Sequence, residues 1–242
     1  MELTNLKSAI FATMTDKRIL VIDDNTHTLL LVRRALQQAG FQVETSTSAE
    51  EALIHIQEKG LPHLAIVDIH MAGMSGLEFC ERVQQFSDLP VIMLTAVEKE
   101  ETIVQAIELY AEDYMTKPFS PNELVARVGR VLRRLGDFAY TLEPVTFVDK
   151  NLQVNFSECH AYVGGEQVSL TPTETKLLYI LMRNSGQIVT ADFLLRRLWP
   201  REIAFEDRLR VYVHRLRKKI DLDENRQYIV SERGIGYRFH SV

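Results

Sequence analysis

Short apolar runs recur through the first half of the chain, and each one ends at a polar residue. They predict strands at residues 18–22, 41–45, 64–68, 90–94 and 113–116. Segments with helical spacing follow each run. The third run is apolar up to its last residue, which is typical of a strand buried on both faces of a parallel sheet. This alternation predicts an α/β fold, a doubly wound five-stranded parallel sheet with helices on both faces.

The pattern changes in the second half of the chain. Short alternating runs predict strands at 145–148, 152–155, 161–163 and 167–170, which would form a small antiparallel sheet. Helices are predicted at about 171–184, 190–199 and 208–221. A hairpin around the glycine-containing turn at 233–236 follows them. The second half is therefore predicted to be an α+β domain.

These patterns divide the chain into an N-terminal extension at 1–16, a first domain at 17–135, a linker at 136–144 and a second domain at 145–242. The N-terminal segment lacks the apolar core of a signal peptide. No apolar run approaches the roughly 18 residues that a membrane span needs. Two widely spaced cysteines are typical of reduced thiols. We expect a cytoplasmic protein without a membrane partner.

Charge is distributed unevenly along the chain. Residues 1–135 contain 13 Lys and Arg against 19 Asp and Glu, and residues 136–242 contain 15 against 14. The two nets, −6 and +1, add up to the −5 of the whole chain. Residues 196–219 hold nine basic and three acidic residues. Such a basic segment favours a local anionic partner, although a solvated helix face explains it equally well.

Polar side chains stand where the predicted strands end. They are Asp23, Asp24, Asp68, Thr95 and Lys117. Right-handed crossovers bring the carboxyl ends of parallel strands to one edge of the sheet, where open α/β sheets bind ligands. We expect these side chains to converge there. The alternative, that they are helix caps and surface charges, leaves their common position unexplained.

The residue types at this edge indicate phosphoryl chemistry. Three crowded carboxylates need a cation, and Mg²⁺ with its oxygen ligands is the simplest choice. An aspartate can accept a phosphoryl group as an acyl phosphate, while the metal screens the charge. Lys117 and Thr95 offer a positive charge and a hydroxyl for the phosphoryl oxygens. We therefore expect Asp68 to be a phosphoacceptor.

Residues 17–135 resemble the receiver domains of bacterial two-component systems, which have a flavodoxin-like fold. The matching residues are the Asp23-Asp24 pair, Asp68, Met74-Ser75-Gly76, Thr95-Ala96 and Lys117-Pro118-Phe119. The resemblance implies that a histidine kinase phosphorylates Asp68.

The family's residue roles carry over as expectations. The implied Mg²⁺ ligands are Asp23, Asp24, Asp68 and the backbone carbonyl of His70. Thr95 and Lys117 would hold the phosphoryl group, and Thr95 and Tyr114 would form the switch. The Lys117-Pro118 peptide bond would be cis.

Three positions depart from the family pattern. Ala72 stands where proline is usual, four residues after the acceptor, and favours a more flexible loop. His70 is unusual two residues after the acceptor, where it either influences dephosphorylation or has no role. Tyr110 replaces a glycine before the fifth strand and puts the conformation of that turn in doubt.

The face formed by the fourth helix, fifth strand and fifth helix makes a two-fold dimer in the related subfamily. Asp113 with Arg127, and Glu108 with Arg130, look like its ion pairs. Ile103 stands where a basic partner for Glu123 is expected, so one pair is missing. We expect a homodimer on phosphorylation, with a weakened interface.

The predicted helix at 208–221 has the pattern of a DNA-reading helix. Leu209, Val213, Leu216 and Ile220 form a stripe that would face a core. The remaining faces carry Arg210, His214, Arg215, Arg217 and Lys218. Arginine can bind guanine O6 and N7 bidentately in the major groove. This helix is therefore predicted to bind double-stranded DNA.

The second half resembles the winged helix-turn-helix domain of OmpR/PhoB regulators. The match rests on the segments 170–174, 216–219 and 233–239. It implies that Arg215 and Arg217 read bases and that Arg233 enters a minor groove. Arg210 and Lys218 would contact phosphates. Thr175 replaces an aromatic core residue, which predicts looser packing of the first helix. Trp199 either fills the core or precedes a loop that faces RNA polymerase.

Together these features predict a phosphorylation-dependent transcriptional regulator that binds repeated promoter half-sites as a dimer. An aspartyl-phosphate phosphatase of the haloacid dehalogenase type is an alternative. It needs a second aspartate two residues after the nucleophile, where this chain has His70. A constitutive DNA-binding protein with a degenerate receiver is a further alternative, and the complete set of strand-end residues argues against it.

Overall fold

The computed structural model describes residues 17–96, 109–135, 143–221 and 227–240. The predicted N-terminal extension, most of the helical segment expected between the strands at 90–94 and 113–116, and most of the linker lie outside these residues, as do Ile103 and Glu108. The chain forms two compact units.

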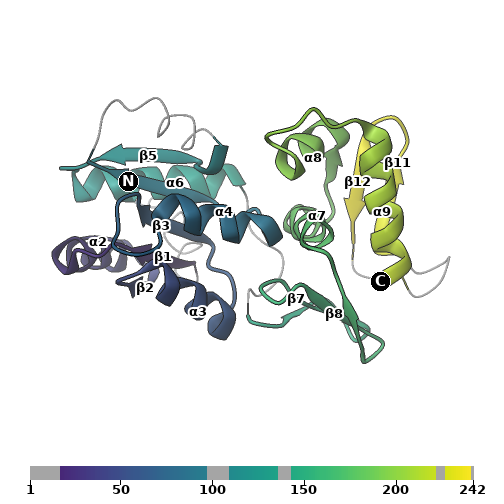
Figure 1. Ribbon diagram of the computed structural model, residues 1–242, viewed down its shortest axis with the longest axis horizontal. Helices are drawn as coiled ribbons and strands as arrows, with labels where there is room; N and C mark the ends of the chain where they lie inside the picture. The colour runs from purple at the N-terminus through teal and green to yellow at the C-terminus, as the bar shows by residue number, and fades with distance from the viewer. Residues whose placement is uncertain (1–16, 97–108, 136–142, 222–226, 241–242) are drawn as a thin grey trace, which may run out of the picture. The chain divides into compact units, whose positions relative to one another are not determined.

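The first unit is built on a parallel sheet with the strand order β2-β1-β3-β4-β5 (Figure 1). The strands are β1 (Arg18–Ile22), β2 (Gln42–Ser46), β3 (Leu64–Asp68), β4 (Val91–Thr95) and β5 (Asp113–Thr116). In the middle of the sheet, Ile66 lies between Val21 and Ile92 in register. The doubly wound sheet predicted from the alternation of runs is confirmed.

Helices pack on both faces of this sheet. The helices of the described part are α2 (Thr26–Gln38), α3 (Ala49–Lys59), α4 (Gly76–Phe86) and α6 (Pro121–Leu135). On one face, Val32 of α2 and Val128 of α6 join Val21 and Ile66 of the sheet in one buried cluster. α3 and α4 lie on the other face (Figure 1). Because both faces are covered, every residue of β3 and β4 is buried, as the apolar runs predicted.

The described residues of the second unit form two antiparallel sheets and three helices. One sheet has the order β6-β7-β8-β9, and the other has the order β10-β12-β11. The strands are β6 (Thr146–Phe147), β7 (Leu152–Asn155), β8 (His160–Val163), β9 (Glu166–Ser169), β10 (Ile188–Thr190), β11 (Ile229–Glu232) and β12 (Gly236–Phe239). The helices are α7 (Pro172–Arg183), α8 (Ala191–Leu198) and α9 (Glu206–Ile220). This arrangement confirms the predicted winged helix-turn-helix fold.

The start of α7 is fixed by a local motif. Thr171 caps the helix through its side chain, and the Thr171 backbone N–H donates to Glu174 Oε2 at 2.8 Å. Looser packing was expected at Thr175, but this residue is fully buried. Its hydroxyl donates to the Thr171 carbonyl at 3.0 Å, so the polar group is satisfied within the helix.

β10 was not predicted from the sequence. It turns the expected C-terminal hairpin into a three-stranded sheet by pairing with β12. The two strands lie close at Gly236, where a Cβ atom would be 2.0 Å from the Val189 carbonyl oxygen. The second glycine of the predicted turn is therefore needed for the close approach of two backbones.

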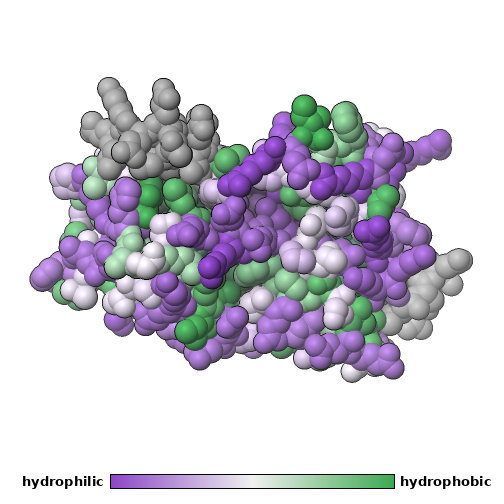
Figure 2. Space-filling model, viewed as in Figure 1, coloured by the Kyte–Doolittle hydropathy of each residue, from purple (hydrophilic) through white to green (hydrophobic). Residues whose placement is uncertain are grey.

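Within the described residues, we find no helix with the length and apolar character of a membrane span. The face shown in Figure 2 is mostly hydrophilic, and its hydrophobic side chains form small separate groups.

Candidate phosphoryl site and candidate DNA interface

The carboxyl edge of the parallel sheet brings the predicted site residues together. Asp23 follows β1, Asp68 ends β3, Thr95 ends β4 and Lys117 follows β5. Asp23 and Thr95 are almost completely buried, and Asp68 is 6% exposed. Lys117 Nζ donates to Asp23 Oδ2 at 2.7 Å and to Asp68 Oδ2 at 2.8 Å. One ammonium group therefore bridges two buried carboxylates.

Burial and pairing act on these charges in opposite directions. Burial raises the pKa of Asp68, and the hydrogen bond from Lys117 only partly offsets this, so the pKa stays above its ordinary value. Burial alone would lower the pKa of Lys117, but the hydrogen bonds to Asp23 and Asp68 outweigh it and raise the pKa. Lys117 is therefore charged at neutral pH and stabilises the ionised aspartates.

Asp24 completes a group of three carboxylates. Oxygen atoms of Asp23, Asp24 and Asp68 lie within 4.8 Å of one another. Asp24 is exposed, and its Oδ2 accepts the backbone N–H of Ala72 at 3.2 Å. A proline at position 72 has no N–H to donate, so this contact depends on the departure from the family pattern. An all-carboxylate oxygen set suits a hard divalent cation.

Neighbouring groups hold this edge in place, and the sequence alone did not identify them. The Asn25 backbone N–H donates to Asp23 Oδ1 at 2.9 Å, while the Asn25 side chain caps α2. Glu50 Oε1 of α3 accepts the Met74 N–H at 3.0 Å and so holds the loop after β3. Asn25 could have been found as an N-cap residue next to the aspartate pair. Glu50 carried no comparable signal.

The candidate DNA interface consists of α9 and the wing, which is the hairpin formed by β11, β12 and the turn between them. The predicted apolar stripe of α9 is buried as expected. Arg210, His214, Arg215 and Lys218 are exposed on α9, and Arg233 is exposed between β11 and β12. Arg210 also pairs with Glu206 and Asp207 of its own helix, and the Arg215 guanidinium lies 5.8 Å from the centre of the Tyr212 ring.

Arg217 differs from the other predicted DNA-binding residues. Its Nε donates to the Ile229 carbonyl at 2.9 Å, and its Nη2 donates to Ser231 Oγ at 2.8 Å. Both partners belong to β11, so the guanidinium is directed at the wing.

Comparison with known proteins identifies both units. Residues 19–129 match the response regulator receiver domain, and residues 165–239 match the C-terminal domain of transcriptional regulatory proteins. The chain is 36% identical over 232 residues to the alkaline phosphatase synthesis transcriptional regulatory protein PhoP of Bacillus subtilis. This match covers 92% of the chain and 96% of PhoP. This chain is an OmpR/PhoB-family response regulator.

Other relatives agree with this assignment. The phosphate regulon transcriptional regulatory protein PhoB of Shigella flexneri is 35% identical, with 92% of this chain and 97% of PhoB covered. The DNA-binding response regulator MtrA of Mycolicibacterium smegmatis is 36% identical, with 92% and 96% covered. The chain is therefore a phosphorylation-dependent transcriptional regulator, which implies a histidine kinase and DNA as partners. Family members are regulators and not enzymes, which removes the phosphatase alternative.

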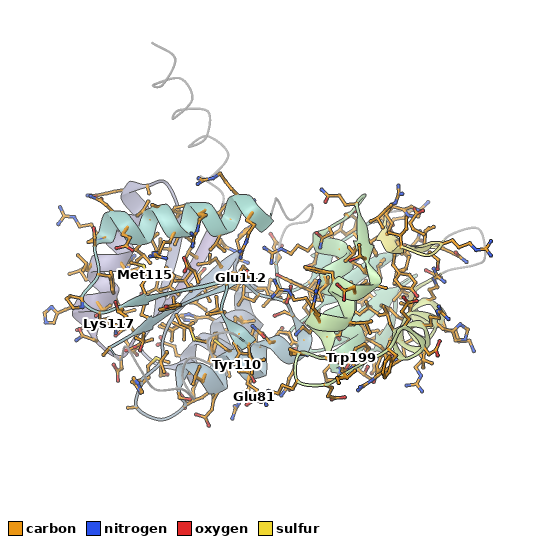
Figure 3. All side chains as sticks on the ribbon, turned by 90° about the horizontal axis from the view of Figure 1, so that it is seen from above. Glu81, Tyr110, Glu112, Met115, Lys117 and Trp199 are labelled. Atoms are coloured by element: carbon orange, nitrogen blue, oxygen red, sulfur yellow. The ribbon has the colours of Figure 1, made fainter. Side chains whose placement is uncertain are left out.

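β4 and β5 carry the two residues expected to form the switch of this response regulator, Thr95 and Tyr114. The Lys117-Pro118 bond is cis, as the receiver resemblance implied. Lys117 N–H donates to the Thr95 carbonyl at 2.7 Å. The Tyr114 side chain is 53% exposed. Lys117 and Glu112 stand at opposite ends of β5 (Figure 3), which separates the phosphoryl site from the ion pair of Glu112 with Arg134 of α6.

Of the residues expected at a dimer interface, Asp113, Arg127 and Arg130 are described and pair within the receiver domain itself, and Glu108 lies outside the described residues. Asp113 accepts from Arg127 at 3.1 Å and from Arg130 at 2.7 Å. Glu123, whose expected basic partner is replaced by Ile103, pairs with Arg127 at 2.7 Å. Arg127 thus contacts both Asp113 and Glu123 within one chain.

Trp199, labelled in Figure 3, belongs to the buried residues of the DNA-binding domain. It is 6% exposed, and its ring packs against Tyr212 with 5.3 Å between ring centroids. The Arg208 guanidinium lies 4.4 Å from the Trp199 ring centroid, within the range of a cation–π interaction. In the loop that follows, Ile203 and Phe205 are 88% and 72% exposed.

Proposed function

We propose that Asp68 is the residue that accepts the phosphoryl group from a histidine kinase. An Asp68 oxygen attacks phosphorus, so a P–O bond forms while the P–N bond to the kinase histidine breaks and its electrons return to the imidazole. The observation that carries this assignment is the Lys117 bridge to Asp23 and Asp68 at the carboxyl edge of the sheet. Lys117 is within reach of phosphoryl oxygens there, and Thr95 offers them a hydroxyl.

We further propose that this acidic edge binds Mg²⁺. The residues that would hold it are Asp23, Asp24, Asp68 and the backbone carbonyl of His70. The three carboxylates lie within 4.8 Å of one another and provide the oxygen donors that this ion prefers. When bound, Mg²⁺ screens the negative charge of the transferring group. Lys117 keeps Asp23 and Asp68 paired and in position.

The phosphoryl group is proposed to act through Thr95 and Tyr114. Thr95 would turn toward the new oxygens and leave room for the exposed Tyr114 ring to move inward. Phosphorylation would then favour a homodimer formed through Glu108, Asp113, Arg127 and Arg130. Arg127 and Arg130 already contact Asp113 within one chain, so dimerisation would exchange these pairs for equivalent pairs between chains.

The dimer would place two copies of α9 in successive major grooves. The proposed DNA contacts are Arg210, His214, Arg215 and Lys218 from α9, together with Arg233 from the wing. The exposed loop with Ile203 and Phe205 is proposed to face RNA polymerase. A regulator of this kind would work in the cytoplasm.

The phosphoacceptor assignment is tested by labelling the full chain with acetyl phosphate and Mg²⁺. The unsubstituted chain should gain one acid-labile phosphoryl group, and Asp68→Asn should gain none. Asp192→Asn, an exposed aspartate of α8, is the matched control and should label normally. Equal labelling of the Asp68→Asn variant would remove Asp68 from this role.

A further inference from the structure

β11 is the edge strand of the three-stranded wing sheet, whose order is β10-β12-β11. On one side it pairs with β12 from Ile229 to Glu232. An edge strand leaves backbone groups on its other side that need partners. In this chain α9 supplies a donor to one of them, the Ile229 carbonyl.

Two residues at the end of α9 make contacts here. Arg217 donates to the Ile229 carbonyl and to the Ser231 hydroxyl. Asp221 Oδ1 accepts the Tyr228 N–H at 2.9 Å. Asp221 is the C-cap residue of α9, and its backbone N–H donates to the Arg217 carbonyl at 2.8 Å. The end of α9 therefore contacts β11 through the donor Arg217 and the residue just before β11 through the acceptor Asp221.

The far end of the wing is anchored separately. The Ile235 carbonyl accepts the Ala191 N–H at 3.0 Å at the start of α8. Arg233 lies between the two anchored regions and is exposed. Its position relative to the exposed face of α9 is therefore set by how firmly β11 is held to that helix.

We propose that Arg217 is a positioning residue that holds the wing against α9, and that it does not read a base. Its guanidinium gives two of its five N–H donors to β11 and so fixes the spacing between the major-groove side chains of α9 and the minor-groove side chain Arg233. This differs from the role that the family resemblance implied for Arg217. The inference rests on the proposed DNA contacts of α9 and the wing.

The first test needs no DNA. Hydrogen exchange of the full chain should show faster exchange of the β11 amides in Arg217→Ala than in the unsubstituted protein, with no change in β7 and β8. Lys218→Ala is the matched control, because it removes one neighbouring exposed charge from the same helix, and it should leave β11 unchanged. Unchanged exchange of β11 in Arg217→Ala would overturn the proposal.

The second test is a double-mutant cycle on DNA. The probe is the duplex that the unsubstituted full chain selects from a random-sequence pool. Arg217→Ala and Arg233→Ala should each weaken binding by roughly ten-fold, and the double variant should be little weaker than either, because a released wing no longer delivers Arg233. Ser231→Ala removes one of the two Arg217 contacts and keeps every charge of α9. In this background too, Arg233→Ala should weaken binding less than it does in the unsubstituted chain.

Other outcomes separate the competing roles of Arg217. Lost preference at one base pair in the pool selected by Arg217→Ala would make it a base reader, and additive losses in the cycle would make it an independent phosphate contact; either result overturns the proposal. If Arg233→Ala has no effect alone, the proposed wing contact with DNA fails, and the exchange experiment still decides whether Arg217 holds β11.

Discussion

One residue changes the chemistry of the loop beside the phosphoryl site. Where the family pattern has proline, Ala72 supplies a backbone N–H, and this N–H reaches Asp24 at 3.2 Å. Hydrogen bonds to a metal-binding carboxylate orient it and tune its affinity. Ala72 was expected to loosen the loop, whereas the contact with Asp24 ties the loop to the proposed metal site.

We predict that Ala72→Pro weakens Mg²⁺ binding because Asp24 loses its orienting donor. The loss should lie at the lower end of the roughly 10- to 100-fold range typical of such second partners, since both residues are exposed. Isothermal titration of the unphosphorylated full chain with MgCl₂ measures it directly. Ala72→Ser keeps the N–H and should bind like the unsubstituted chain. Tighter Mg²⁺ binding by Ala72→Pro would show that the N–H competes with the metal.

Strand-end residues could be predicted from the sequence because parallel topology forces Asp23, Asp68 and Lys117 to one edge. The contacts of Ala72 and Arg217 could not. Asp24 and Ala72 are 48 residues apart, and their hydrogen bond depends on the path of a loop. The sequence places Arg217 on a polar face of its helix, and only the position of β11 shows that two of its five N–H donors are bonded to the wing.

Among the elements, α7 shows how a local motif joins distant parts of a domain. The capping residue Glu174 is 2% exposed at its side chain and pairs with Lys219 of α9 at 2.7 Å. Burial alone would raise the pKa of Glu174, but the hydrogen bonds from Lys219 and from Thr171 outweigh it and hold the pKa below its ordinary value of 4.5. The cap of one helix is therefore an anchor for the end of another.

This lowered pKa makes the DNA-binding domain sensitive to acid. Below pH 4.5 the unfolded chain takes up a proton at Glu174 that the folded domain resists, so the free energy of unfolding falls as the pH drops. Glu174→Gln should cost about 1–3 kcal/mol at pH 7 and progressively less as the pH falls through the folded pKa.

Urea unfolding followed by tryptophan fluorescence tests this prediction, because the single tryptophan of the chain, Trp199, reports on this domain. Glu166→Gln, at an exposed position of β9, is the control and should show no such pH dependence. A cost at pH 3 equal to that at pH 7 would mean that the ionisation of Glu174 is not the cause.

Elements were predictable to the extent that their signals are local. The threonine, proline and glutamate of 171–174 predict the start of α7, and the apolar runs predict β3 and β4. β10 has three residues, too few to show a period. It exists because Gly236 lets β12 approach the Val189 backbone, and that is a property of two segments together.

At the scale of the whole molecule, the proposed receiver dimer should act on DNA through avidity. Linking two DNA-binding domains makes the second binding event intramolecular and can raise affinity by roughly 10²–10⁴ without new contacts. Treatment with acetyl phosphate should therefore strengthen binding to a duplex with two half-sites much more than to one with a single half-site.

Electrophoretic mobility shifts with both duplexes, taken from the selected sequence, measure this difference. Asp68→Asn should show no gain on either duplex after the same treatment. An equal gain on the single-site duplex would indicate that phosphorylation changes the DNA-binding domain itself and not the pairing of two chains.

The Lys117 bridge has a consequence for how this regulator is made. The chain carries one cation of its own beside its two buried aspartates, so part of the negative charge at the sheet edge is offset before any outside ion arrives. We therefore expect the receiver to fold without a divalent ion, with the remaining negative charge left to attract the proposed metal to the folded site.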